Sequence, residues 1–125
     1  MLKKITKYSD AWISYLETLS KLYPNLADEP YFVNTDIFVN STGCIYLCGL
    51  VSRFVDGLMV KVLWIYNVAG TNVTTKDNIK ELKILGLENG CVWMMAKPRN
   101  KSVKRLYRMA GFEENGEYQK LGLYK

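Results

Sequence analysis

The sequence predicts a single α/β domain (α+β in the broader sense) with a mixed central sheet flanked by helices. Two runs, residues 58–68 and 91–96, are apolar on both faces, as strands covered on both sides of a sheet are. A helical pattern separates them, and strand, helix and strand within about forty residues predict a right-handed crossover with a parallel pair. A length of 125 residues suits one hydrophobic core and is short for two, so we expect one domain over residues 1–125.

The N-terminal part begins with a weakly alternating segment, residues 2–7, that predicts a short strand. Ser9 or Asp10 then caps a helix that runs to about residue 23, where Pro24 ends it. The buried stripe of this helix consists of Trp12, Leu16, Leu19 and Tyr23. Residues 31–39 allow two readings, because they alternate as a strand does, while the preceding Asp28-Glu29-Pro30 is typical of a helix start.

A β-hairpin is the clearest feature of the middle of the chain. Residues 40–43 form a turn cluster, residues 45–54 a strand, and Asp56-Gly57 is the hairpin signal that returns the chain into the 58–68 strand. A polar loop over 70–75 follows, and Thr74 or Thr75 caps a helix that runs to about residue 87. The inward-facing residues of this helix are Ile79, Leu82 and Leu85.

Residues 100–112 predict a further helix with two distinct stripes. The apolar stripe consists of Val103, Leu106, Tyr107 and Ala110. The basic stripe beside it consists of Lys101, Lys104, Arg105 and Arg108. Gly111 suits the left-handed position after a helix, and Phe112 can then pack back. A turn around Asn115-Gly116 and a final strand over 118–124 complete the sheet.

The positive charge of the chain is concentrated in one region. The net charge is +5, and six basic residues fall within residues 97–108: Lys97, Arg99, Lys101, Lys104, Arg105 and Arg108. Such clustering favours an anionic partner, which could be a nucleotide-bearing cofactor, a nucleic acid or an acidic protein. The alternative is a solvated helix face with no partner.

The cysteine and histidine content excludes several kinds of site. Cys44, Cys48 and Cys91 lie in apolar runs, which predicts buried, reduced thiols and a cytoplasmic setting. The sequence has no histidine and no CxxC pair, so we expect no metal site and no Ser-His or Cys-His catalysis. No signal peptide and no membrane span are expected either, because no apolar run is long enough.

The helix over 100–112 resembles the fourth helix of the GNAT superfamily, the acyl-CoA-dependent N-acyltransferases. The matching positions are Asn100, Val103, Leu106, Tyr107, Gly111 and Phe112. The order of elements from residue 45 onward is also that of the family. The resemblance implies a GNAT-like fold, and it favours helix over strand for residues 31–39, where the family has a short helix that helps to wall the acceptor site.

The resemblance implies acetyl-CoA as cofactor and an amine on a small molecule or protein as acceptor, with nucleic acid an unlikely partner. Tyr107 would be the catalytic residue that protonates the leaving thiolate. Asn100 would lie near the pantetheine arm. The pyrophosphate would lie against the loop formed by Val68, Ala69, Gly70, Thr71, Asn72, Thr74 and Thr75.

Two features of the sequence depart from the family. The loop has one glycine, Gly70, where the family pattern has two, and the 58–68 strand contains no acid to act as general base. Asp36 and Asp56 are the nearest acids by order along the chain. The alternative reading is therefore a catalytically inactive GNAT-like protein with a structural or binding role, such as a phage virion-type protein, which would be virion-associated.

Overall fold

The computed structural model describes residues 2–98 and 100–124. Three α-helices and two 3-10 turns accompany the strands: α1 (Asp10–Leu22), η1 (Leu26–Asp28), η2 (Phe32–Asn34), α2 (Lys76–Glu88) and α3 (Lys101–Met109). The strands are β1 (Lys3–Lys4), β2 (Asp36–Val39), β3 (Ile45–Val55), β4 (Leu58–Ala69), β5 (Trp93–Ala96), β6 (Glu113–Asn115) and β7 (Tyr118–Gly122). None of the described helices has the length and apolarity needed to cross a membrane.

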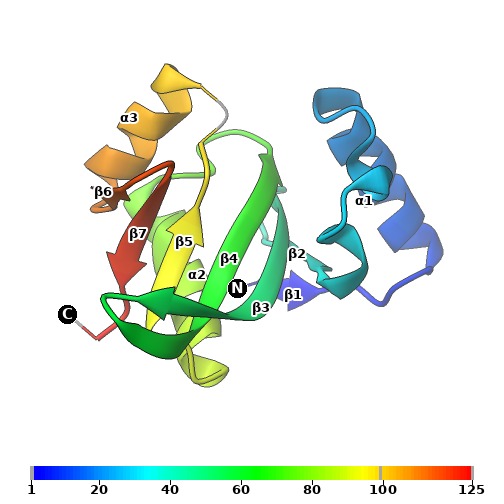
Figure 1. Cartoon of the computed structure of the whole chain (residues 1–125). Helices are drawn as coiled ribbons and strands as arrows, with labels where there is room; N and C mark the ends of the chain where they lie inside the picture. Colours follow the sequence, from blue (N-terminus) through cyan, green and yellow to red (C-terminus); the bar gives the residue numbers. More distant parts are fainter. Residues whose placement is uncertain (1, 99, 125) are drawn as a thin grey trace.

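All seven described strands form one sheet in the order β1-β2-β3-β4-β5-β7-β6 (Figure 1). The β4–β5 pair is parallel, with Val62 opposite Trp93 and Ile65 opposite Ala96, and α2 connects the two strands. The other neighbouring pairs are antiparallel. The predicted mixed sheet and the predicted parallel pair with a helix between its strands are therefore confirmed.

Helices cover both faces of the sheet. On one face, α2 and α3 supply Ile79, Leu82 and Tyr107 to a core shared with Tyr46 and Leu63. On the other face, α1 and the two 3-10 turns pack against β2 and β3, in a core made of Ile5, Trp12, Leu19, Leu26, Ile37, Ile45, Leu47 and Ala69. The alternation of Ile45 and Leu47 with Tyr46 along β3 directs neighbouring side chains to these opposite cores.

The N-terminal helix forms where the sequence places it. The Ser9 side chain accepts a hydrogen bond from the Trp12 N–H at 3.2 Å, which satisfies one of the free donors of the first turn. Trp12 and Leu19 are buried, while Leu16 and Tyr23 are half-buried. The stripe that was predicted to face the core is therefore confirmed.

Residues 31–39 do not form the α-helix that the family resemblance favoured. The turn η2 is three residues long, and the chain then enters strand β2, which pairs with β3. Ile37 is buried and Phe38 is half-buried, an alternation that fits the strand which the residue pattern of 31–39 also allowed. Pairing with β3 satisfies the backbone of β2 and buries Ile37 completely, and this outweighs the helix-start signal.

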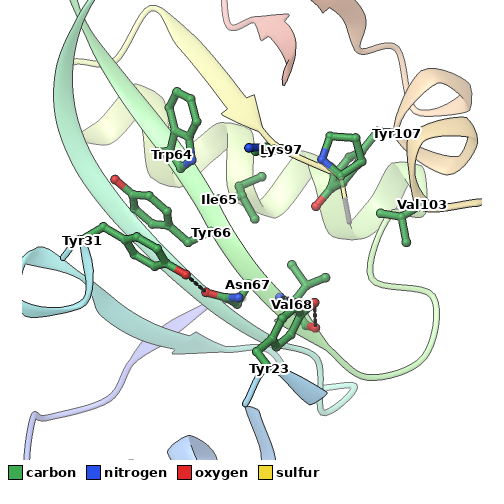
Figure 2. A pocket seen from close by; sticks show the side chains of 11 residues that line it. Tyr23, Tyr31, Trp64, Ile65, Tyr66, Asn67, Val68, Lys97, Val103 and Tyr107 are labelled. Atoms are coloured by element: carbon green, nitrogen blue, oxygen red, sulfur yellow. Dashed lines mark hydrogen bonds between the residues drawn. The ribbon is translucent and has the colours of Figure 1, made fainter. Parts of the chain in front are cut away.

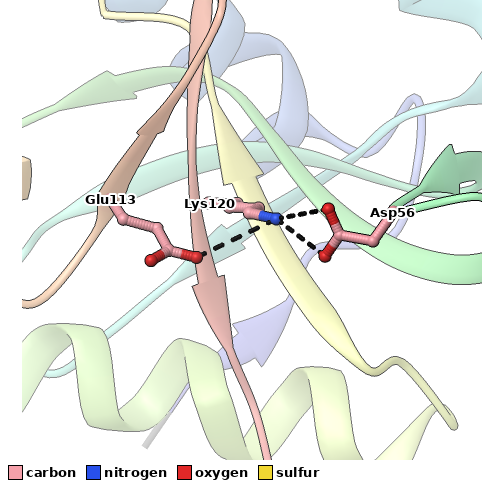
Figure 3. A network of polar contacts seen from close by, with 3 residues as sticks. All are labelled: Asp56, Glu113 and Lys120. Carbon is pink, nitrogen blue, oxygen red and sulfur yellow. Dashed lines mark hydrogen bonds and ion pairs between the residues drawn. The ribbon is translucent and has the colours of Figure 1, made fainter.

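The hairpin between β3 and β4 turns at Asp56 and Gly57, which have φ values of 52° and 84°. Two positive φ values are those of a type I′ turn, which matches the twist of the flanking strands. The turn reaches β7, where the Lys120 Nζ lies 3.2 and 3.0 Å from the two carboxylate oxygens of Asp56 (Figure 3). Glu113 of β6 lies 3.9 Å from the same ammonium, and the ring of Trp93 lies 4.3 Å away.

Helix α3 has the two ends that its sequence predicts. The Asn100 side chain accepts a hydrogen bond from the Val103 N–H at 2.9 Å. At the other end Gly111 has a φ of 104°, and the N–H of Phe112 donates to the carbonyl of Tyr107 at 3.0 Å. This is a Schellman ending, and it places the ring of Phe112 edge-on against Tyr107, with 4.9 Å between centroids.

Candidate functional site

Strands β4 and β5 stop pairing halfway along β4. Their register ends at Ile65 opposite Ala96, while β4 continues to Ala69 and the chain after β5 turns away into α3. A cavity of about 470 Å³ lies where the two strands separate (Figure 2). Its described lining residues are Tyr23, Tyr31, Trp64, Ile65, Tyr66, Asn67, Val68, Lys97, Pro98, Val103 and Tyr107. This size is within the range of small-molecule sites.

A β-bulge shapes the β4 side of this cavity. Cys48 pairs with Ile65 and Leu47 pairs with Asn67, so Tyr66 is an extra residue without an opposite partner in β3. A bulge re-aims the side chains next to it. Here it lets Tyr31 contact two successive residues of β4, since its ring stacks on Tyr66 at 4.1 Å and its hydroxyl donates to Asn67 Oδ1 at 3.2 Å.

Tyr107 reaches the same cavity from α3 (Figure 2). The residue is 3% exposed, and among the described residues its hydroxyl makes no hydrogen bond. Burial raises the pKa of this phenol well above its usual value, and the nearby Cys48 and Tyr23 raise it further. The side chain is therefore a protonated donor at neutral pH with its hydroxyl directed at an open space.

A second hollow, of about 480 Å³, lies between the loop after β4 and the C-terminal half of α3. Its described lining residues are Gly70, Asn72, Val73, Thr74, Thr75, Lys76, Leu106, Met109 and Ala110. Four of the residues expected to hold the pyrophosphate, Gly70, Asn72, Thr74 and Thr75, therefore come together at one surface. The N-terminus of α2 opens at the same place, capped by Thr75, which accepts from the Asn78 N–H.

Buried or half-buried side chains of neighbouring elements fix the conformation of this loop. Three successive loop carbonyls accept hydrogen bonds: Thr71 from Cys44 Sγ at 3.2 Å, Asn72 from Asn78 Nδ2 at 2.6 Å, and Val73 from the Tyr46 hydroxyl at 2.8 Å. Asn40 supports this arrangement, because its Nδ2 donates to Asn78 Oδ1 at 2.9 Å. The loop is thus held by buried polar partners.

The loop offers backbone donors to an anion. Within the described parts of the chain, no hydrogen bond engages the N–H of Asn72, Val73, Thr74, Lys76 or Asp77. The carbonyls of the loop point at buried donors, whereas these N–H groups stay available beside a helix N-terminus. Gly70 adopts a φ of 123°, and a Cβ there would lie 3.0 Å from the Cα of Cys44, so the single glycine is needed by the loop itself.

The remaining predicted site residues lie elsewhere. Val68 lines the first cavity, and its carbonyl accepts from the Tyr23 hydroxyl at 3.0 Å. Ala69 is buried in the core beneath α1, and Thr71 is exposed but borders neither hollow. Asn100 is exposed and serves as the cap of α3.

Neither of the two nearest acids reaches the cavity. Asp56, at the hairpin turn, forms an ion pair with Lys120. Asp36, on β2, has its carboxylate 3.6 Å from the ammonium of Lys4 on β1. The described lining of the cavity contains no aspartate or glutamate.

Sequence reasoning missed the aromatic lining and the buried polar network. Tyr23 was predicted as a core residue, while Tyr31, Trp64 and Tyr66 gave no signal beyond their apolar character. The bulge that exposes Tyr66 to the cavity depends on register, which the sequence pattern does not encode at single-residue precision. Asn40 was expected in a turn cluster and Asn78 was not singled out, yet these two residues are 6% and 7% exposed.

The three cysteines are free and buried, as their contexts predicted. Cys48 and Cys91 have raised pKa values because burial disfavours the thiolate. No group of three potential metal ligands occurs within residues 2–98 and 100–124.

Comparison with known proteins identifies solved structures with the same fold, although sequence comparisons find none. No family model matches the sequence, and no curated protein matches it. Solved structures do match. A tyrosine-to-phenylalanine variant of the AtaT toxin, bound to the C-terminus of the antitoxin AtaR and acetyl-CoA, superposes with a TM-score of 0.65 at 11% identity, over 99% of this chain and 93% of that one.

Two further structures extend the comparison. AtaT complexed with acetyl-methionyl-tRNAfMet gives a TM-score of 0.60 at 10% identity, covering 99% and 95% of the two chains. The KacTA–DNA complex gives 0.58 at 12%, covering 99% and 93%. These complexes contain nucleic acid, which runs against the expectation that nucleic acid is an unlikely partner, and the neighbours are toxins, which gives no support to the virion-type reading.

The likeness extends over almost the whole chain. At this level of identity it establishes the fold. AtaT and KacT are GNAT-family acetyltransferases. The chain therefore has the GNAT fold that the motif from Asn100 to Phe112 predicted.

Proposed function

We propose that the protein is an acyl-CoA-dependent N-acyltransferase that transfers an acetyl group from acetyl-CoA to an amine. The observation that carries this proposal is that residues of the α3 segment line both hollows. The donor-rich loop lies beside Leu106 and Met109, and the cavity at the strand separation lies beside Val103 and Tyr107. One extended ligand along α3 could reach both.

The anionic end of the cofactor would bind at the loop. The N–H groups of Asn72 to Thr74, the first turn of α2 and the Lys76 ammonium together suit a pyrophosphate. The basic stripe of α3 adds positive potential nearby. Bound acetyl-CoA would supply the acetyl group as a thioester. Neighbouring AtaT structures contain acetyl-CoA, which supports this cofactor.

Tyr107 would act at the other end. Its hydroxyl borders the cavity, and its raised pKa keeps the proton on the oxygen until a stronger base appears. A thiolate leaving in the same buried place is such a base, because low polarity raises its proton affinity as well. The amine would enter from the side of Tyr31 and Trp64, and its proton would go to water.

The acceptor could be an amine on a small molecule or on a protein. The complex of AtaT with acetyl-methionyl-tRNAfMet adds an amine carried by RNA to the candidates.

A catalytically inactive binding protein is the second candidate. The observation that favours it is the absence of a carboxylate from the described lining of the cavity, together with the single glycine of the loop.

Calorimetric titration with acetyl-CoA tests the proposal. At a concentration one hundred times the dissociation constant, binding should stabilise the folded state by about 2.7 kcal/mol and raise the melting temperature by several degrees. Lys76→Ala should weaken binding, whereas Lys80→Ala, an exposed lysine one turn further along α2, should not. Absence of binding at millimolar acetyl-CoA would refute the transferase proposal and leave the inactive reading.

A further inference from the structure

The cavity beside β4 has an unusual lining. Five of its eleven described lining residues are aromatic, one is a lysine, and none is acidic. Aromatic walls favour flat, apolar ligands, which stack on the rings or meet their edges. A site that selects a polycationic amine would instead need carboxylates to compensate the charge.

The rings are held in place before any ligand binds. Tyr31 and Tyr66 stack with an interplanar angle of 5°. Gly49 leaves room behind the Tyr66 ring, since a Cβ at this position would lie 3.0 Å from Tyr66 Cε2 and the ring would have to shift slightly. Trp64 contacts Tyr66 at 5.9 Å and Tyr118 at 5.3 Å between centroids. A preformed aromatic wall binds a ring with little ordering cost.

A buried amide provides polar recognition beside the rings. Asn67 is 6% exposed and borders the cavity, and the Tyr31 hydroxyl engages its Oδ1 (Figure 2). Its Nδ2 has no hydrogen-bond partner among the described residues. Because Asn67 lines the cavity, this amide is a donor that an acceptor atom on a ligand can engage.

The charge around the cavity limits what the ligand can carry. Lys97 contributes the charged group of the lining, and its only carboxylate contact among the described residues is Glu117 at 3.9 Å, with both side chains largely exposed. The basic stripe of α3 begins beside it. A ligand with several positive charges would be repelled here.

Building on the proposed acyl transfer, we infer that the acceptor is a monoamine whose amino group is joined by a short linker to a flat aromatic ring. The ring lies against Tyr31 and Tyr66, and the amine lies near Tyr107. In the reaction, a bond forms between the amine nitrogen and the acetyl carbon, and the carbon–sulfur bond of the thioester breaks. The thiolate takes a proton from the Tyr107 hydroxyl, and the amine loses one proton to water. Water then returns a proton to the Tyr107 oxygen, which regenerates the phenol.

The test compares three amines at saturating acetyl-CoA: 2-phenylethylamine, its saturated counterpart 2-cyclohexylethylamine, and spermidine. We expect kcat/KM to be about tenfold higher for the phenyl than for the cyclohexyl compound, and lowest for spermidine. Calorimetric titration with each of the three amines, in the absence of acetyl-CoA, measures the same preference as a difference in binding. The inference is therefore tested even if the cofactor does not bind.

Two variants locate the effect. Tyr31→Leu should reduce the phenyl-over-cyclohexyl ratio toward one and leave acetyl-CoA binding unchanged, while Tyr124→Leu, an exposed tyrosine outside the cavity, should change neither. Asn67→Asp places an acid in the lining and should improve the relative use of spermidine. Melting curves report whether each variant is folded.

Equal use of the cyclohexyl amine, or preference for spermidine, would overturn the inference and leave the proposed transferase intact. Failure of acetyl-CoA to bind, with selective binding of 2-phenylethylamine, would overturn the proposed function and support the aromatic site. No binding of any of the three amines would overturn the inference.

Discussion

Replacing Tyr107 with phenylalanine removes one oxygen from the boundary of the cavity. Because the hydroxyl has no hydrogen-bond partner among the described residues, the substitution breaks no described protein contact. The ring keeps its place against Phe112. We therefore expect Tyr107→Phe to change the free energy of unfolding by less than about 1 kcal/mol, since the cost of a lost buried hydrogen bond does not arise.

The expected loss is in turnover. General acid catalysis contributes about a hundredfold or more, equivalent to about 2.7 kcal/mol of transition-state stabilisation. The affinity for acetyl-CoA should change little, because the proposed phosphate contacts lie at the loop after β4, in a hollow that Tyr107 does not line. The assay measures acetyl transfer to a panel of amines together with a urea denaturation of the same preparation.

Tyr46→Phe is the contrasting control. Tyr46 is as deeply buried as Tyr107, but its hydroxyl donates to the Val73 carbonyl at 2.8 Å. Its removal should cost about 1–3 kcal/mol of stability. Full turnover in Tyr107→Phe would refute the assignment of this hydroxyl as the acid. A stability loss as large as that of Tyr46→Phe would show that the hydroxyl serves a structural partner.

Three more predictions follow from the polar contacts and the pKa shifts. Asn78→Leu leaves Asn40 Nδ2 and the Asn72 carbonyl without their hydrogen-bond partners. It should therefore lower the free energy of unfolding by about 2–4 kcal/mol and weaken acetyl-CoA binding measured by calorimetry. The control Lys80→Ala should change neither quantity. Asp56→Ala should lower the free energy of unfolding by about 1–3 kcal/mol, because it removes the carboxylate that pairs with the Lys120 ammonium, whose side chain is only 8% exposed. Lys120→Met should be nearly neutral, because it removes the buried charge itself. Equal urea midpoints for Asp56→Ala and the unmutated protein would contradict this prediction. Burial raises the pKa of the phenols of Tyr46, Tyr66 and Tyr107 above the unfolded-state value of about 10. These groups therefore stabilise the folded state below about pH 10, and this stabilisation should be lost as the pH rises toward their folded-state pKa values. Urea midpoints that stay constant from pH 9 to 12 would disprove this prediction.

The sequence predicted those parts of the fold that local chemistry determines. Gly111 and Phe112 end α3 as expected, and Asp56-Gly57 forms the predicted turn, because φ > 0 positions leave a clear signature in residue type. The parallel pair followed from two buried runs and the helix between them. Strand β6, residues 113–115, was not predicted, because its short polar sequence gains strand geometry only by pairing with β7.

The candidate site was predictable only in part. The loop from Gly70 to Thr75 could be located, since it precedes a capped helix. The side chains that fix it, Cys44, Tyr46 and Asn78, come from elements whose relative placement is a tertiary property. The resemblance to the family favoured a helix at residues 31–39, where backbone pairing with β3 prevails instead.

The position of β7 within the sheet has a consequence for how the chain folds during synthesis. β7 lies between β5 and β6, and its residues Gln119, Lys120 and Gly122 are buried along with Leu123 (Figure 1). A ribosome must therefore release the chain to about residue 123 before the sheet can close and before Lys120 can meet Asp56, which it follows by 64 residues. Until then the apolar edge of β5 is open to other chains, so nascent protein that stalls short of β7 should be a target for chaperones and a source of aggregation.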